Sequence, residues 1–382
     1  MTRHSPTRGG RPPRELRTGG ALDRFVAERA ARDAFSGTVL LTLRGRTVLA
    51  RSHGAADRAR RVPIGPGTRF ALASTAKLFT AVAVQQLVRR GEVVHHERLG
   101  TYLDGLPAAI ADVTLHQLLT HTSGLGDYRA TEEFRAGARV WASSAELHEG
   151  IAAIIRASPL RFPPGTRFHY SNSGYELLGA LVTRVSGRPY PDYIREHVFG
   201  PAGMTATGWF TRPRWDADPD FARPYTRRPS GERADVLAEK PFVGTASGDA
   251  FSTARDMARF GRALADGVLL GSAHTRHFLS GRLALPPRPD GPGGTGPVPE
   301  LAFQGYGPHA ILTGGQWVLR HSGGSAGTGT SLEVHPDNGW VSVVLSNHDV
   351  PEVLPIVAEA RRLITADRPG HRPRTDRRSP RP

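Results

Sequence analysis

The spacing of hydrophobic residues changes along the chain, from strand-like near both ends to helix-like in the middle. Two β-rich runs in residues 37–54 flank Arg44-Gly45-Arg46, which predicts a β-hairpin. Strand patterns return at 316–320 and 329–346. The pattern therefore predicts an α+β fold, in which an antiparallel sheet is built from both chain ends and flanked by helices, with a mostly helical insertion between those ends.

Apolar residues at helical spacing predict six helices. They begin near residue 22, Ser74, Ser143, Asn172, Thr253 and residue 352. Ser143 and Thr253 each open an S/T-x-x-E/D pattern that is typical of a helix N-terminus, and Gly91 and Gly187 supply C-terminal stops. The stretch 281–300 is dense in Pro and Gly, which predicts a long surface loop.

The net charge of +15 is concentrated at the chain ends, where Arg, Pro and Gly dominate. Residues 1–20 and 367–382 are predicted to be disordered basic tails. Because no aromatic residues alternate with the arginines, we expect no specific nucleic-acid partner. Residues 21–366 are predicted to form the folded domain. Its two parts are a sheet subdomain of about 21–65 plus 300–366 and a helical subdomain of about 66–299.

Residue types that are missing narrow the class of protein. The sequence has no cysteine, which excludes disulfides, thiol catalysis and cysteine zinc sites. It has no run of about 18 apolar residues that would predict a membrane span, and its N-terminus lacks the apolar core of a signal peptide. We therefore predict a cytoplasmic protein without a membrane span.

The first candidate for chemistry is a serine with a rare lysine close behind it. Only two of the 50 Lys and Arg residues are lysines, Lys77 and Lys240, and Lys77 stands three residues after Ser74. Arginine stays protonated, whereas a buried lysine amine can lose its proton and act as a base. At the start of a helix the two residues would share one face, so the amine could activate the hydroxyl as a nucleophile. The alternative is an exposed helical lysine without a role.

Two further segments place polar groups where a cleft could form. Tyr170 directly precedes a predicted helix in Tyr170-Ser-Asn172, so its phenol can project into a cleft; alternatively, Asn172 only caps that helix. His321-Ser-Gly323-Gly324 lies between two strand patterns, where glycines would let a substrate lie along a strand edge and contact backbone N–H groups. The alternative for this segment is a glycine-rich turn.

Together these segments resemble the serine β-lactamase and penicillin-binding-protein-like hydrolases, in particular the class C-like esterase and peptidase branch. That family carries S-x-x-K, then Y-x-N, then K-T-G or H-x-G. Here the motifs stand in the same order as Ser74-Thr-Ala-Lys77, Tyr170-Ser-Asn172 and His321-Ser-Gly323. The resemblance covers about residues 21–366 and implies the β-lactamase/transpeptidase-like fold.

The resemblance implies a role for each matching residue. Ser74 would be the acylated nucleophile, and Lys77 and Tyr170 would share the work of general base and acid. The backbone N–H groups of Ser74 and Gly324 would form the oxyanion hole. No metal ion and no organic cofactor would be required.

The third motif departs from the pattern of many relatives, which have a lysine where this chain has His321. His321 would keep the field around Tyr170 positive or hydrogen-bond the substrate. Gly323 would contact the substrate beside it, and Asn172 would orient Lys77 and the substrate. A neutral histidine would hold a carboxylate less well, which favours esters and thioesters over carboxylated β-lactams.

Competing motifs are weaker. Gly323-Gly-Ser325-Ala-Gly327 matches the G-x-S-x-G nucleophile elbow, but that elbow needs a following helix and a strand pattern follows here. Lys240 lies in a polar stretch and is predicted to be an ordinary surface lysine.

Several histidines resemble metal ligands only superficially. His95-His96-Glu97 has the wrong spacing for two ligands on one helical face. His121 lies in Leu118-Leu-Thr-His-Thr-Ser-Gly124, which the family uses as a structural loop, and His116 lies just before it. No metal site is predicted.

The predicted function is that of a serine hydrolase that forms an acyl-Ser74 intermediate on small-molecule ester, thioester or peptide substrates. The first choice is a cytoplasmic esterase. Alternatives are an acyltransferase or peptide-cyclising thioesterase that uses a carrier protein, a D-amino-acid peptidase or β-lactamase, and a catalytically silent binding protein on the same fold.

Overall fold

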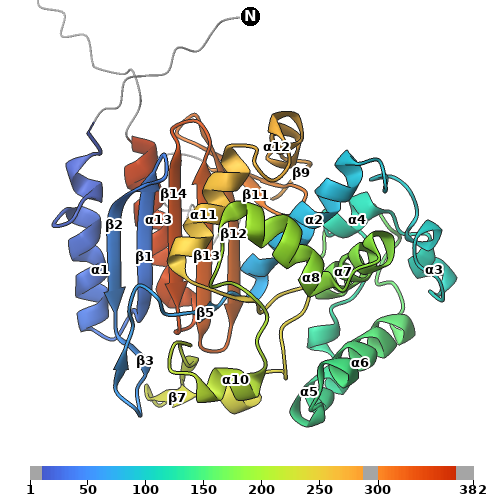
Figure 1. Ribbon diagram of the computed structural model, residues 1–382, viewed down its shortest axis with the longest axis horizontal. Helices are drawn as coiled ribbons and strands as arrows, with labels where there is room; N and C mark the ends of the chain where they lie inside the picture. Colours follow the sequence, from blue (N-terminus) through green and yellow to red (C-terminus); the bar gives the residue numbers. More distant parts are fainter. Residues whose placement is uncertain (1–10, 287–299, 367–382) are drawn as a thin grey trace, which may run out of the picture.

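A computed structural model of the chain describes residues 11–286 and 300–366 (Figure 1). One antiparallel sheet has the strand order β2-β1-β14-β13-β12-β11-β10-β9. Its strands are β1 (Gly37–Leu43), β2 (Arg46–His53), β9 (Leu283–Ala284), β10 (Leu301–Gln304), β11 (His309–Thr313), β12 (Gln316–Ser325), β13 (Thr328–His335) and β14 (Trp340–Ser346). The smaller pairs are β3 (Ala55–Asp57) with β4 (Val62–Pro63), β5 (Phe70–Ala71) with β8 (Phe251–Ser252), and β6 (Tyr225–Arg227) with β7 (Arg233–Asp235).

Helices cover both faces of the sheet and form most of the segment between its two halves. The α-helices are α1 (Ala21–Ala31), α2 (Lys77–Arg89), α3 (Ala108–Ala111), α4 (Leu115–Leu119), α5 (Glu132–Val140), α6 (Ser144–Ala157), α7 (Asn172–Ser186), α8 (Tyr190–Ile194), α9 (Gly200–Ala202), α10 (Arg212–Ala217), α11 (Ala254–Ala265), α12 (Ser272–Phe278) and α13 (Val350–Ala366). Short 3-10 helices are Arg14–Leu16, Ala73–Ala76, Leu99–Thr101, Tyr128–Ala130 and Leu237–Glu239, and Arg195–Phe199 is a π-helix. The six predicted helices correspond to α1, α2, α6, α7, α11 and α13.

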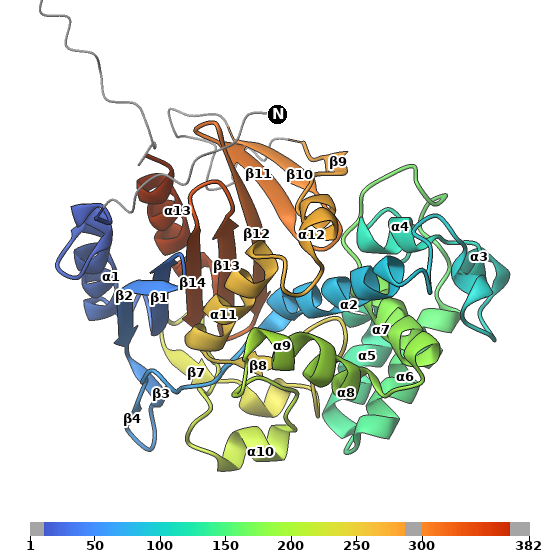
Figure 2. The ribbon, with the colours of Figure 1, turned by 45° about the horizontal axis from the view of Figure 1, so that its top comes forward.

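The two ends of the chain meet in the sheet, as the α+β prediction requires. Strand β1 pairs with β2 on one side and with β14 on the other, with Gly37 opposite Ser346. Alternate side chains of β1 enter different cores: Val39 packs with α1 and α13 on one face, and Leu40 packs with α11 and α2 on the other. Figure 2 shows these helices on either side of the strands. The predicted fold is therefore confirmed.

The segment before α1 is ordered, so the predicted N-terminal tail is wrong for residues 11–20. Arg14–Leu16 forms a 3-10 helix, and Leu16 is fully buried in the same core cluster as Leu22. Burial of this leucine favours the folded segment because it removes apolar surface from water, and the N–H of Gly19 donates to Asp23 Oδ2 at 2.6 Å. Residues 1–10 and the predicted tail at 367–382 lie outside the described residues.

The glycine-rich third motif is part of a strand and not a loop between strands. Strand β12 runs through His321 to Ser325, and the turn follows at Ala326 and Gly327, whose φ is +65°. The strand pattern at 329–346 divides into β13 and β14. Within the predicted loop at 281–300, Leu283–Ala284 forms the edge strand β9, and residues 287–299 lie outside the described part.

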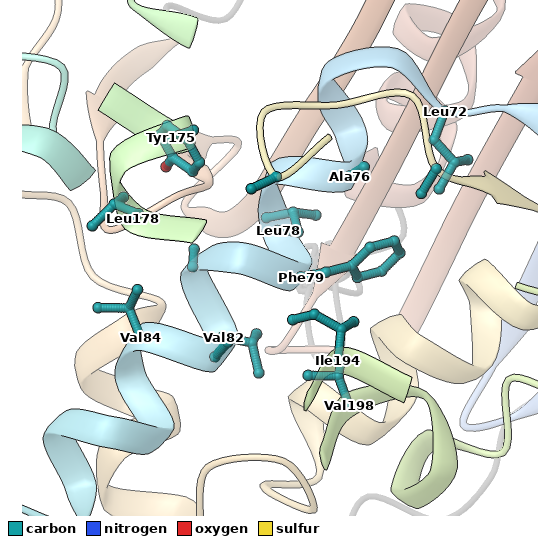
Figure 3. Packing of buried hydrophobic residues seen from close by; sticks show 14 of the residues in the cluster. Leu72, Ala76, Leu78, Phe79, Val82, Val84, Tyr175, Leu178, Ile194 and Val198 are labelled. Carbon is teal, nitrogen blue, oxygen red and sulfur yellow. The ribbon is translucent and has the colours of Figure 1, made fainter. Parts of the chain in front are cut away.

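The start of α2 is held rigidly in the main core. Between Phe70 and Leu87, Ser74 is the one residue that is not buried. Figure 3 shows how the neighbouring side chains pack; they include Leu72, Ala76, Phe79 and Val82, together with Tyr175 and Leu178 of α7 and Ile194 and Val198. Within this segment the half-buried Ser74 is therefore the one side chain that reaches solvent, and its neighbours are buried. Among the described helices, none is long and apolar enough to cross a membrane.

Candidate active site

Ser74 lies in a strained turn between β5 and α2. The residue before it, Ala73, has a φ of +44°, which is unfavourable for a residue with a side chain. The turn is held from outside, since the N–H of Asp249 donates to the carbonyl of Ala73 at 3.1 Å. Ser74 itself belongs to the first turn of a 3-10 helix, where backbone N–H groups have no partner within the helix. Its hydroxyl and its N–H are therefore both available to a ligand.

Lys77 lies under Ser74 and is completely buried. Its Nζ is 3.2 Å from Ser74 Oγ and 2.6 Å from Asn172 Oδ1, and it also donates to the carbonyl of Ser247. The amide oxygen and the carbonyl can only accept hydrogen bonds. A neutral amine would satisfy both with its two N–H groups and direct its lone pair at the serine hydroxyl. Among the described ion pairs none includes Lys77, so no carboxylate contact fixes it as a cation.

Asn172 is oriented by a carboxylate that the sequence analysis missed. Asn172 Nδ2 donates to Asp127 Oδ2 at 2.7 Å, which turns Oδ1 toward Lys77. Asn172 does not cap α7, because the side chain of Ser171 does so by accepting from the N–H of Gly174. The second motif therefore places its asparagine toward the lysine.

The Ser247 carbonyl, which accepts a hydrogen bond from Lys77, is held in place by Glu176, a residue that the sequence analysis did not single out. Glu176 Oε1 accepts from the N–H of Ser247 at 3.3 Å and from the hydroxyl of Tyr128 at 3.2 Å. These contacts fix the backbone of Ser247 beside the amine. No sequence signal reveals such a residue, since the group that touches Lys77 is a backbone carbonyl.

Tyr170 faces the cleft with its hydroxyl free of protein partners. The hydroxyl is buried and makes no hydrogen bond within the described part of the chain. Lys77 Nζ lies 5.0 Å from the centre of the Tyr170 ring. The ring also contacts His121, with centroids 4.4 Å apart. An unpartnered buried hydroxyl is costly, and this one borders the cavity beside Ser74, where a bound molecule could supply the missing hydrogen bond.

His121, predicted as a structural loop residue, packs against Tyr170 from its loop. Its backbone has a φ of +58°, and its Nδ1 accepts from the N–H of Ser171 at 3.2 Å. Its ring also stacks on Tyr175 at 5.2 Å. Burial, reinforced by the nearby Lys77, holds the pKa of His121 well below its usual range, so the ring is neutral at pH 7.

His321 is brought to the same cleft by β12, but as a neutral group. Burial is the main cause that holds the pKa of His321 well below its usual range, with His309 and Lys77 adding to it. Nδ1 lies 2.9 Å from the carbonyl of Ser322, which can only accept, so Nδ1 carries the proton and Nε2 is an acceptor. The expectation of a positive field from His321 is therefore not met.

The open edge of β12 faces Ser74. Strand β11 pairs with β12 only as far as Arg320, so residues 321–325 pair with β13 alone. Gly323 approaches the serine turn so closely that a Cβ there would lie 2.2 Å from the carbonyl oxygen of Leu72. A cavity of about 250 Å³ is lined by Ser74, His121, Phe168, Tyr170, Gln304, His309, His321, Ser322 and Gly324. Four of the seven residues predicted from the motifs line this cavity, namely Ser74, Tyr170, His321 and Gly324. Lys77 and Asn172 are buried and reach Ser74 through the Lys77 hydrogen bonds.

The second lysine is not an ordinary surface residue, and that prediction is wrong. Lys240 Nζ donates to Ser325 Oγ at 2.9 Å and to the carbonyl of Ala326. Burial lowers the pKa of Lys240 to about 8. Ser325 itself ends a strand that continues through a turn into another strand, so it lacks the strand-to-helix context of a nucleophile elbow.

Fold and cleft together define a penicillin-binding-protein-like serine hydrolase class. The chain matches the model of the Beta-lactamase family over residues 22–367, and it belongs to that family. Penicillin-binding protein 4* of Bacillus subtilis (strain 168) is 33% identical over 207 residues, which make up 53% of this chain and 41% of that protein. Esterase EstB of Burkholderia gladioli is 34% identical over 202 residues, half of each chain.

A solved structure agrees over nearly the whole chain. The crystal structure of a penicillin binding protein from Bacillus halodurans superposes with a TM-score of 0.75 at 30% identity and covers 88% of this chain and 99% of that one. By contrast, this chain spans about half the length of the curated relatives that it matches. The predicted family and fold are confirmed, and the prediction of a serine-hydrolase class is confirmed at the level of the family.

Proposed function

We propose that this protein is a serine hydrolase that forms an acyl-enzyme on Ser74, with small esters as its first choice of substrate. The observation that carries the proposal is the set of hydrogen-bond partners of Lys77 Nζ. Asn172 Oδ1 and the Ser247 carbonyl can only accept a hydrogen bond, whereas Ser74 Oγ can also donate one. This arrangement suits a base that removes the proton of the serine.

The proposed reaction proceeds in two halves. Ser74 Oγ attacks the substrate carbonyl carbon while its proton passes to Lys77 Nζ, and the oxyanion lies between the N–H groups of Ser74 and Gly324. The tetrahedral intermediate then collapses, and the leaving group departs with a proton from the Tyr170 hydroxyl, which Lys77 restores. Water attacks the acyl-Ser74 ester in the same way and releases the acid.

Two features support esters over carboxylate-bearing leaving groups. His321 is neutral, so the side of the cleft near Tyr170 offers no histidine cation to a carboxylate. A related protein, EstB, carries the name esterase. The cytoplasmic location and a carrier-protein partner stay predictions from the sequence alone.

The direct test is covalent labelling. We expect a fluorophosphonate to modify the folded protein once, on the peptide that contains Ser74, and to leave heat-denatured protein unlabelled, as read by mass spectrometry of a digest. Turnover of a 4-nitrophenyl ester but not of a chromogenic cephalosporin would support the esterase, and faster acyl transfer to an added amine than to water would favour the acyltransferase. Labelling of Ser325, or of no residue, would refute the proposal.

A second prediction concerns Asp127 as a positioning residue. Asp127→Ala should lower kcat/KM for the ester by about 10- to 100-fold, as is typical when the partner that orients a catalytic side chain is lost. The amide of Asn172 could then rotate and present its NH₂ to Lys77. Asp127→Asn should recover most of the activity, since its side-chain oxygen can still accept from Asn172.

The control separates positioning from folding. Asp127 also accepts from the N–H of Arg129 at the start of a 3-10 helix, so its loss removes a cap as well. Thr131→Ala removes the neighbouring cap, where the Thr131 hydroxyl accepts from the N–H of Phe134. It should lower the melting temperature by a similar amount and keep the activity. Equal activity losses in Thr131→Ala and Asp127→Ala would count against the positioning role.

A further inference from the structure

The second lysine, Lys240, contacts the end of β12, the strand whose open edge also faces Ser74. Lys240 follows the 3-10 helix Leu237–Glu239, and its Nζ donates to the hydroxyl of Ser325 at 2.9 Å and to the carbonyl of Ala326 at 2.5 Å. These bonds use two of its three possible donors. One donor therefore remains for a ligand.

The side chain of Ser325 lies on the face of β12 that looks toward Ser74. Side chains alternate along a strand, so residues 321, 323 and 325 share one face. A Cβ on Gly323 would meet the backbone of Leu72 and Thr75, on either side of the serine turn. A Cβ on Gly324 would instead meet Val350, on the opposite face. Lys240 is thus anchored through Ser325 on the face of β12 that looks toward Ser74, and Ser325 is the next residue after Gly323 on that face.

A charged pair flanks the lysine without neutralising it. Arg129 and Asp249 form an ion pair at 2.9 Å beside Ala73. Asp249, Asp349 and Glu239 are the acidic groups that act on Lys240, and Arg129 opposes them. Among the described ion pairs none includes Lys240, and burial still lowers its pKa to about 8. A partly buried ammonium without a carboxylate contact favours the arrival of an anion.

The geometry of the proposed reaction decides which part of the substrate reaches this ammonium. The leaving group must face Tyr170, the proposed acid, in the cavity that His321 lines. With the oxyanion between Ser74 and Gly324, the acyl chain is left to run the other way along β12, toward Ser325. There a narrow hollow of about 20 Å³ is lined by Lys240 and Ser325 together with Arg212 and Asp249, whose carboxylate is paired with Arg129. The hollow has room for no more than the terminal group of a ligand at its mouth.

We propose that Lys240 and Ser325 form an anion subsite that selects acyl groups ending in a carboxylate. The proposal rests on acylation of Ser74. In this proposal the positive charge of the cleft is that of Lys240, on the side of the acyl group, and not of His321 in the third motif. The preferred substrates would then be half-esters of dicarboxylic acids and related acidic acyl compounds.

Matched substrates test the proposal. We would compare the 4-nitrophenyl esters of hexanoic acid, adipic acid and 6-aminohexanoic acid, which have equal chains and neutral, negative and positive ends. The adipate half-ester should be preferred over the hexanoate by about tenfold in kcat/KM at pH 7, as expected for one charge-assisted hydrogen bond. This preference should fall as the pH rises through about 8, because a lysine is charged only below its pKa. It should also weaken at high salt.

Variants tie that preference to the named residue. Lys240→Met should abolish it and Lys240→Arg should keep it, while Arg195→Met, which removes an exposed cation far along the chain, should leave the wild-type ratio. The ratio of two esters on one enzyme cancels any common loss of active protein. The pH dependence of the wild-type protein supplies a second measurement that needs no variant.

The possible outcomes separate the two proposals. If Ser74 is acylated by the hexanoate but wild type and Lys240→Met show the same adipate-to-hexanoate ratio, the anion subsite is refuted and the hydrolase stands. A preference for the aminohexanoate would also refute it, because Asp249 would then be the recognising charge. If no ester acylates Ser74, the proposed function and the subsite both fail.

Discussion

Replacement of Lys77 by arginine is expected to lower kcat/KM for a 4-nitrophenyl ester by about 10³-fold or more, within the range of a lost general base. The guanidinium keeps its proton at every accessible pH, so it cannot accept one from Ser74. It is also larger and planar, and the site is fully buried. Lys77→Met should reduce activity to a similar level, because it too lacks a basic nitrogen. The measurement is the initial rate of 4-nitrophenol release.

The pair of variants tells a base from a fixed charge. If Lys77 acted only through its positive charge, Lys77→Arg would retain activity and Lys77→Met would not. Arg89→Lys, at the exposed end of the same helix, is the matched control and should behave like wild type. Circular dichroism and melting temperatures show whether each variant is folded. Folded Lys77→Arg protein with more than about a tenth of wild-type activity would contradict the assignment.

Features set by local sequence could be predicted well. The Ser143 and Thr253 caps begin α6 and α11 as expected, and Gly187 ends α7 in a left-handed conformation. The distance from Ser74 to Lys77 is likewise local, since three residues make one helical turn. Helix caps and side-chain spacings within one turn depend only on residues close in the chain, so the local sequence is sufficient to predict them.

Contacts between distant residues could not be predicted in this way. Asp127 and Asn172 are 45 residues apart, and Lys240 and Ser325 are 85 apart. Nothing in either local stretch indicates the partner. For Lys77, the missed contact is a backbone carbonyl that any residue could provide. The fold creates the first pair by packing two segments of the helical insertion together, and the second by placing the insertion against the end of β12.

The glycines of the third motif were misleading for a physical reason. Glycine weakens a strand, so Gly323 and Gly324 suggested a break between strands. In the structure they continue β12, because Gly323 lies against the backbone of Leu72 and Gly324 lies against Val350. Because these two glycines have no side chain, β12 can approach the serine turn on one face and Val350 on the other. This requirement becomes visible only in the folded structure.

The same close approach makes Gly323→Ala a sensitive probe of the proposed oxyanion hole. The new Cβ would lie 2.2 Å from the carbonyl oxygen of Leu72 and 2.8 Å from the N–H nitrogen of Thr75, so the serine turn must move away from β12. The N–H groups of Ser74 and Gly324 stand on the two sides of that gap. A displacement of about 1 Å at such a site costs about 10²-fold in rate. We expect kcat to fall by that amount, and the free energy of unfolding to fall by about 1–3 kcal/mol from overpacking.

A matched glycine shows whether the effect is local. Gly67 has open space around its Cβ direction and no positive φ, so Gly67→Ala should leave kcat unchanged and should not destabilise the protein. Urea unfolding and ester kinetics measured on both variants separate stability from rate. If Gly323→Ala destabilises the protein but keeps full kcat, the turn has moved without harm to catalysis, and the oxyanion cannot lie between Ser74 and β12. A third outcome is a slower ester turnover with unchanged labelling of Ser74 by a fluorophosphonate. It would place the damage after the first acylation. That result would contradict the proposed geometry, because both halves of the reaction use the same two N–H groups.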